Sequence, residues 1–182
     1  ISTRSGVWTV TDNGPSSATI NGSSGTDTLM LESTSAHLNS AVDAQIVSIE
    51  NIRVKAPTGP GFSVTVSGGS VTGVSVLDGG DSLADGSYTL TFTDDSAAGE
   101  SGAAGTATVS GGKVSSVTVS AGGSGYTSNT YATADWVPLG VNIDLHAQSD
   151  GFFVIGYVGA DTIKGSTGAD TLMGGAGADS MD

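Results

Sequence analysis

Residues 156–182 consist of three contiguous nonapeptides that share one pattern. Each copy has Gly at its first and fourth positions, Asp at its sixth and an aliphatic residue at its eighth. A unit this short cannot bury its hydrophobic side chain alone, so successive copies must stack and share a core. The pattern therefore predicts a parallel β-solenoid in which two nonapeptides make one coil, the eighth residues point inward and the glycines allow the turns.

A fourth copy of the pattern stands alone at residues 22–30. Stretches with the sequence pattern of strands, similar to that of solenoid coils, lie on both sides of the middle of the chain. We therefore expect two parts of one β-solenoid, 1–57 and 137–182, with at most a short helical turn within 36–45.

Residues 58–136 differ from these surroundings. They begin with Pro and Gly residues and contain an internal duplication, in which 64–80 matches 107–123. Alternating Val residues separated by Gly-Gly pairs are typical of β-hairpins. We expect this segment to be an inserted, small β-sandwich-like domain, which makes the whole chain all-β.

The chain is strongly acidic. Its 182 residues carry a net charge of −13 and only 5 Lys and Arg, so little is present to neutralise phosphates, and nucleic acid is a poor partner. The absence of Cys excludes disulfides and thiol chemistry. No apolar run is as long as a membrane span, so we expect no membrane insertion. The negative charge favours cations as ligands.

Stacked coils bring Asp residues together. Asp161 and Asp179 are 18 residues apart, so two-nonapeptide coils place them on one edge, where their carboxylates repel unless a cation lies between them. Ca²⁺ takes oxygen ligands, including the backbone carbonyls that glycine-rich turns expose, and the three nonapeptides contain no Cys or His. The predicted calcium-binding residues are Asp161, Asp170, Asp179, Gly156, Val158, Gly159, Gly165, Thr167, Gly168, Gly174, Ala176, Gly177 and Asp27. In the alternative interpretation each Asp caps its own loop, and for the isolated Asp27 the two interpretations have equal weight.

The repeats resemble the calcium-binding β-roll of the repeats-in-toxin (RTX) family, whose consensus is G-G-x-G-x-D-x-U-x. Only the third copy has the full Gly-Gly pair, because Tyr157, Ser166 and, in the isolated copy, Ser23 occupy the second position. The segments 28–54 and 142–175 are similar to solenoid coils of bacterial surface-layer members of this family. This resemblance implies a secreted protein, exported by the type I route, that assembles on the cell surface.

We therefore expect a calcium-stabilised structural protein that associates with itself into a lattice or filament, with cell-surface polysaccharide as a further possible partner. One alternative is the secretion and folding tail of an extracellular RTX enzyme. Another is a phage-fibre or adhesin module that binds carbohydrate, because 122–127 resembles small β-repeats of such proteins.

We expect no enzyme. The two histidines, His37 and His146, have no neighbouring pattern of a hydrolase triad or a zinc site. Asp144 and His146 are separated by one residue and are interpreted as a solvated polar pair rather than a catalytic one.

Two further groups of residues have a structural and a functional interpretation. Acidic pairs could serve a glycosidase or a second calcium site, but their Gly- and Ser-rich surroundings favour exposed turns; they are Asp78 with Asp81, and Asp94 with Asp95. Four aromatic residues could form a carbohydrate platform, but we favour core positions for them; they are Trp8, Tyr126, Tyr131 and Trp136.

Overall fold

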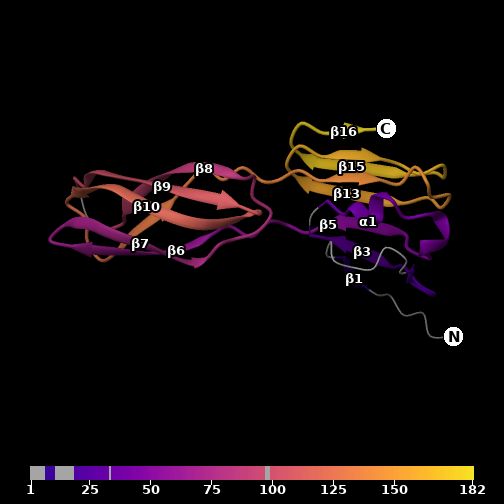
Figure 1. The fold of residues 1–182 in the computed structure, drawn as a ribbon, viewed down its shortest axis with the longest axis horizontal. Helices are drawn as coiled ribbons and strands as arrows, with labels where there is room; N and C mark the ends of the chain where they lie inside the picture. The colour runs from indigo at the N-terminus through magenta and orange to yellow at the C-terminus, as the bar shows by residue number, and fades with distance from the viewer. Residues whose placement is uncertain (1–6, 11–18, 33, 97–98) are drawn as a thin grey trace. The chain divides into compact units, whose positions relative to one another are not determined.

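The computed structural model describes residues 7–10, 19–32, 34–96 and 99–182. The chain divides into two units, one made of 1–56 with 139–182 and the other of 57–138, and both are rich in strands (Figure 1). These limits lie within two residues of the boundaries expected from the sequence. Each unit is described by itself below.

The first unit is a parallel β-solenoid. One face is a five-stranded parallel sheet with the order β1 (Val7–Val10), β3 (Thr28–Leu31), β5 (Asn51–Val54), β13 (Phe153–Val158) and β15 (Thr171–Ala176). The other face has two parallel sheets, β2 (Ile20–Asn21) with β4 (Ile46–Val47), and β12 (Asn142–Asp144) with β14 (Thr162–Lys164) and β16 (Ser180–Met181). The chain passes alternately from one face to the other.

The solenoid continues across the inserted unit. Strand β5 pairs directly with β13, so that Ile52 lies opposite Val154 although the second unit separates them in the sequence. A short helix, α1 (Ala36–Asn39), and a 3₁₀ turn, η1 (Asp43–Gln45), interrupt the coils where the sequence allowed a helical turn.

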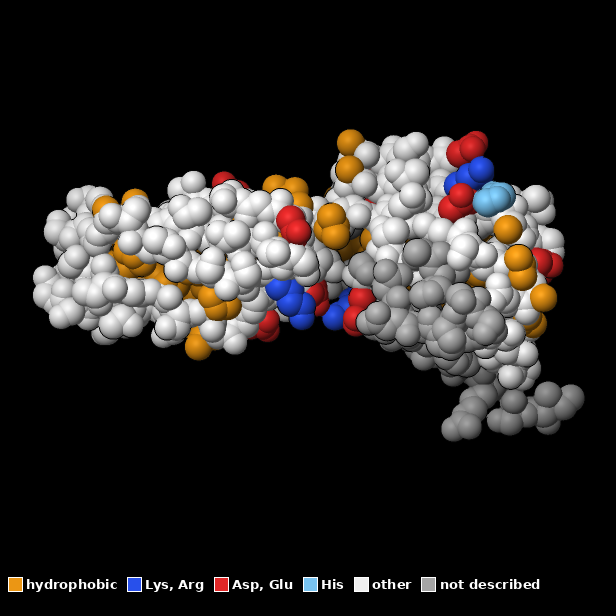
Figure 2. All heavy atoms as spheres, in the orientation of Figure 1, with side chains coloured by type: hydrophobic (Ala, Val, Ile, Leu, Met, Phe, Trp, Pro, Cys, Tyr) orange, Lys and Arg blue, Asp and Glu red, His pale blue; other side chains and the backbone are white. Residues whose placement is uncertain are grey.

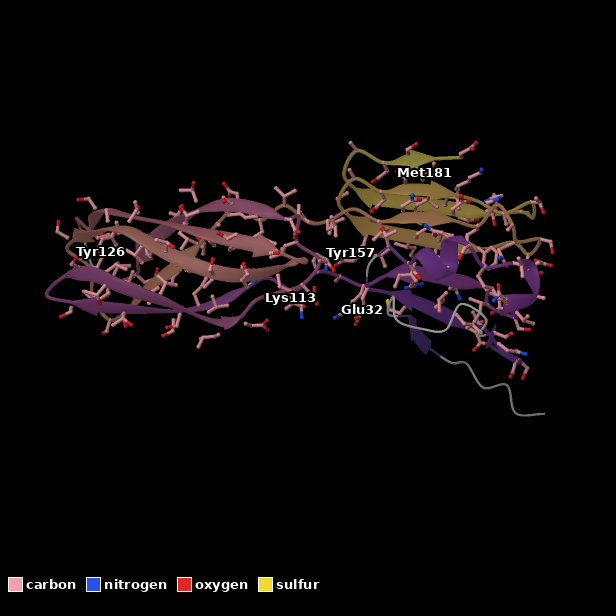
Figure 3. The ribbon with its side chains drawn as sticks, viewed as in Figure 1. Glu32, Lys113, Tyr126, Tyr157 and Met181 are labelled. Carbon is pink, nitrogen blue, oxygen red and sulfur yellow. The ribbon has the colours of Figure 1, made fainter. Side chains whose placement is uncertain are left out.

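Aliphatic ladders fill the solenoid. In the five-stranded sheet Leu29, Ile52 and Val154 stand in register, and all three are fully buried. On the other face Ile143 pairs with Ile163, which pairs with Met181 on the outermost strand, where the side chain is 51% exposed (Figure 3). The inward residues Leu29 and Ile163 of the nonapeptides therefore belong to one core cluster, against which Leu172 packs, as the pattern predicts, whereas Met181 lies outside it.

The second unit is antiparallel. A four-stranded sheet has the order β10 (Lys113–Ser124), β9 (Ser101–Ser110), β8 (Gly86–Asp94) and β11 (Thr130–Thr133), and β6 (Gly61–Ser67) pairs with β7 (Ser70–Asp78). A separate hydrophobic cluster lies within this unit. On the face drawn in Figure 2, most of the surface of this unit consists of backbone and of side chains that are neither charged nor apolar.

The sequence duplication is also a structural one. Both copies form hairpins, β6–β7 and β9–β10, whose Gly-Gly turns have positive φ at both residues, as two-residue hairpin turns require. Each hairpin has an extra residue at the same place, Thr72 or Ser115, whose hydroxyl donates at 3.1 Å to the carbonyl of the facing strand. The backbones and the bulges of the two copies therefore match.

The two copies bind each other reciprocally. The N–H of Leu83 donates to Gly112 in the turn of the second hairpin, and the N–H of Tyr126 donates to Gly69 in the turn of the first, both at 3.0 Å. Leu83 and Tyr126 occupy equivalent places in the duplication, so this relation is a local two-fold symmetry.

The ends of the second unit are held by its own central segment. Thr58 exchanges hydrogen bonds with Asp81, by Thr58 N–H to Asp81 Oδ1 and Asp81 N–H to Thr58 O. Three residues further on, Ala84 N–H donates to Val137 O at 2.8 Å. Both ends of the insertion are therefore fixed to residues 81–84.

The aromatic residues of this unit are mostly internal. Tyr126 is buried, and Trp136 packs against Phe62 and Tyr88 with ring centroids 6.0 and 5.1 Å apart. Tyr131 is 42% exposed, and the side chain of Trp8 lies outside the described part of the chain. The core interpretation thus holds for Tyr126 and Trp136, and it is wrong for Tyr131.

Candidate metal centre

The four nonapeptide loops share one close approach. In each loop the carboxylate of the sixth residue faces the Cα of the first, so that a Cβ on the first residue would collide with Oδ2 of the Asp. The pairs are Gly22 with Asp27, Gly156 with Asp161, Gly165 with Asp170, and Gly174 with Asp179. Gly is therefore required at the first position because the space of its side chain belongs to a carboxylate oxygen.

The carboxylates of the terminal repeats also join neighbouring coils. Oδ1 of Asp161 accepts the N–H of Val141 at 2.8 Å, and Oδ1 of Asp179 accepts the N–H of Asp161 at 3.0 Å. Thr162 pairs with Ser180, which confirms that two nonapeptides make one coil. Asp161 and Asp179 are therefore neighbours on one edge of the solenoid, as their spacing predicts.

Asp161 is the most constrained of these groups. Its side chain is 1% exposed, and no donor in the described residues reaches its Oδ2. The carbonyl oxygen of Gly174 faces the same space, because a Cβ on Gly156 would lie 2.5 Å from it. Burial raises the pKa of Asp161 above its ordinary value of 3.8, the N–H of Val141 opposes this, and the charge of Asp179 raises the pKa further.

This environment fits a hard cation. Two acceptor oxygens converge without a donor between them, and a buried acceptor that lacks a partner costs about 1–3 kcal/mol. Ca²⁺ binds carboxylate and carbonyl oxygens in flexible geometry. Within the described residues no three His, Cys, Asp or Glu side chains gather around one point. A calcium ion held by Asp161 and Asp179 would therefore take most of its other ligands from backbone carbonyls.

The backbone of this edge follows the glycine-rich consensus even where the residue departs from it. Tyr157 has φ +95°, close to the +104° of Gly175 at the same position of the third copy, and Gly159 and Gly177 also have positive φ. Tyr157 lies at the end of β13 (Figure 3). The substitution of Tyr for Gly thus leaves the loop conformation unchanged.

The second terminal copy is different. Its loop leads from β14 to β15, on the opposite edge from the loops of the other two copies. Neither Ser166 nor Gly168 has a positive φ. The N–H of Ser166 donates to Asp170 Oδ2 at 2.7 Å, and the N–H of Phe152 donates to Asp170 Oδ1 at 2.8 Å. The structure therefore does not bring Asp170 together with Asp161 and Asp179.

Asp27 lies apart from the terminal repeats. It is fully buried, its N–H donates to Glu50 Oε2 at 2.7 Å, and its carbonyl accepts the N–H of Asn51. Ser23 and Gly25 have positive φ, as on the edge of Asp161. No sequence pattern singles out Glu50, a carboxylate residue directly before β5 on the coil next to Asp27.

The third residues of the repeats, which were predicted to contribute carbonyls, lie at the ends of strands or in loops. Val158 pairs with Ala176 on adjacent coils, and the carbonyl of Ala176 accepts the N–H of Gly159 at 2.9 Å. A carbonyl has two lone pairs, so this bond leaves capacity for a cation. Thr167 is held by Gln148, through its N–H and hydroxyl, on the opposite edge.

The Asp144–His146 pair lies at the surface. Nδ1 of His146 is 2.7 Å from Oδ1 of Asp144, and the His side chain is 56% exposed. Burial would raise the pKa of Asp144, but hydrogen bonds from His146 and its charge outweigh this and lower the pKa. The geometry is that of a solvated polar pair. The side chain of His37 lies outside the described part of the chain.

One expectation about the acidic pairs is wrong. Asp94 is not an exposed turn residue: it is buried and accepts hydrogen bonds from Ser96, Thr127 and Thr130. Burial alone would raise its pKa, but these bonds hold the pKa well below its ordinary value. Asp94 therefore fastens the loop before β11. Asp78 is exposed and accepts the N–H of Gly80 in its own turn, as expected. Asp81 is half-buried and instead accepts the N–H of Thr58.

Residues 155–182 match the family model of the RTX calcium-binding nonapeptide repeat, which comprises 4 copies. Comparisons with curated proteins and with solved structures gave no match. Among the described residues no helix is long and apolar enough to cross a membrane. The chain thus carries a calcium-binding RTX repeat segment, of a kind typical of secreted proteins.

Proposed function

We propose that this chain is a calcium-stabilised structural segment of a bacterial cell-surface assembly, a surface layer or a surface filament, without a catalytic role. In this proposal the protein leaves the cell by the type I route and associates with further copies of itself. Calcium fixes the fold of the repeat segment and reduces the repulsion between acidic copies, since each carries a net charge of −13.

The observation that carries the proposal is the repeat segment, residues 155–182, which continues a parallel β-solenoid. Such a solenoid needs no catalytic cleft and presents a regular outer surface to further copies. Leu172 packs against the core, so its neighbour Met173 on β15 points outward, and Met173 is 50% exposed. A second copy that packs on this outer surface would bury Met173.

The test is assembly of the purified chain under controlled calcium. We expect sedimentation and negative-stain electron microscopy to show ordered assemblies in millimolar Ca²⁺ that dissolve in chelator and do not form with Mg²⁺ alone. Met173→Glu should abolish assembly while far-UV circular dichroism in Ca²⁺ stays unchanged, and Leu77→Glu, an exposed site in the second unit, is the matched control. A chain that stays monomeric at every calcium concentration would refute the proposal.

A further inference from the structure

We propose that the two edges of the terminal repeat segment differ in their need for calcium. The edge of loops 156–161 and 174–179 binds the ion, whereas loop 165–170 is closed by Ser166 without one. The inference rests on calcium binding by the repeats and is independent of surface assembly. The three terminal repeats match the same consensus, but in this proposal they differ in whether they bind calcium.

The first edge lacks donors where its oxygens meet. Asp161 Oδ2 is buried and has no hydrogen-bond partner in the described residues, and the Gly174 carbonyl oxygen faces the same space. Asp179 joins it from the next coil by accepting the Asp161 N–H. Oxygens that converge from two coils, with one buried and unsatisfied, require a cation or a proton.

The second edge already has its donors. Each oxygen of Asp170 accepts a backbone N–H, from Phe152 at Oδ1 and from Ser166 at Oδ2. The backbone N–H groups thus already satisfy both oxygens of Asp170, whereas Oδ2 of Asp161 has no donor in the described residues. Asp170 therefore does not need a cation.

The hydroxyl of Ser166 holds the loop in this conformation. It lies 2.6 Å from the carbonyl oxygen of Asp150 on the preceding coil and 3.0 Å from both carboxylate oxygens of Asp170, and it accepts the N–H of Gly168 at 3.0 Å. Ser23 and Tyr157 occupy the same position of their repeats but have positive φ. The absence of Gly at this position therefore does not by itself explain the difference between the edges; the contacts of Ser166 with Asp150 and Asp170 distinguish this loop.

The test measures ion binding on the purified chain with Tb³⁺ as a calcium probe, excited through tyrosine and displaced by Ca²⁺. Tyr157 is next to Gly156 in the calcium-binding loop, so Tyr157→Phe should remove much of the luminescence. Asp161→Asn should weaken binding by about tenfold or more, since even residues that only support a ligand contribute about 10–100-fold. Asp170→Asn should leave the affinity unchanged, because no ligand of the ion is lost.

Ser166→Ala provides a second variant that keeps every carboxylate. It should lower the thermal midpoint of the repeat segment and leave the calcium affinity unchanged. Circular dichroism in Ca²⁺ checks the fold of each variant. An Asp170→Asn variant that folds but loses as much affinity as Asp161→Asn would overturn the proposal, as would a loss of affinity in folded Ser166→Ala. Neither result depends on assembly, and a monomeric chain with these affinities would refute the proposed function alone.

Discussion

Replacing Asp161 by Asn should change the free energy of unfolding by an amount that depends on calcium. In chelator, Asn keeps Oδ1 for the N–H of Val141 and places an amide donor beside the carbonyl oxygen of Gly174. This removes a buried, unsatisfied carboxylate oxygen, and the gain in the free energy of unfolding should be about 1–3 kcal/mol. The variant should therefore be more stable than the original chain in chelator.

In calcium this advantage should shrink or turn into a deficit. A site with a dissociation constant of about 10⁻⁴ to 10⁻³ M, as in extracellular calcium modules, gains about 1.4–2.7 kcal/mol from 10 mM Ca²⁺. The variant loses most of this gain because an amide is a poorer ligand than a carboxylate. The difference in the free energy of unfolding between the variant and the original chain should therefore decrease as the calcium concentration rises. It changes sign if the original site binds calcium with a dissociation constant at the low end of this range.

The assay is urea unfolding at several calcium concentrations, followed by circular dichroism. Asp170→Asn is the control: its new amide would face the N–H of Ser166, so it should lose about 1–3 kcal/mol in chelator and in calcium alike. If the difference between Asp161→Asn and the original chain does not change with calcium, Asp161 is not a ligand and the account of this edge is refuted.

Three other outcomes are expected. Ile163→Ala should lower the free energy of unfolding in calcium by about 2–5 kcal/mol because it empties a buried site of the solenoid, whereas Thr162→Ala, exposed on the same strand, should change it by about 0.5 kcal/mol or less; urea unfolding measures both. Gly112→Ala, at φ +77°, should cost about 1–2 kcal/mol, whereas Gly59→Ala meets no neighbouring atom and should be neutral in thermal melts. Asp94 has a lowered pKa in the folded state, so its contribution to the free energy of unfolding is present above the ordinary value of 3.8 and is lost as the pH falls below it. At neutral pH, Asp94→Asn should therefore reduce the protection of residues 86–94 against hydrogen exchange. This difference between the variant and the original chain should become smaller below about pH 4.

The regular parts of the fold could be predicted from the sequence because their spacing is strict. Gly at the first position and Asp at the sixth recur together since one occupies the space beside the other, and the eighth residues recur because they share one core. Gly-Gly pairs at equivalent places of the duplication likewise specify two tight hairpins, since other residues rarely adopt positive φ twice in succession.

Other features could not be predicted because their partners are distant in the chain. Ser166 and Ser23 occupy the same position of their repeats, but only Ser166 meets the carbonyl of Asp150. In the sequence Asp94 resembles a turn residue, but in the structure Thr127 and Thr130, more than thirty residues further along the chain, donate hydrogen bonds to it. Glu50 gains its place beside Asp27 only when the coils stack.

The hydrogen bonds that hold Thr58 and Val137 to residues 81–84 bear on the order of folding. If 57–138 were a flexible chain, closing it so that β5 could meet β13 would cost about 4 kcal/mol in conformational entropy. A folded insertion has already met that cost with its own contacts, so its two ends emerge together. Once the insertion is folded, β5 and β13 are separated by the equivalent of a short turn. Their pairing then closes only a short loop, and we expect it to follow the folding of the insertion.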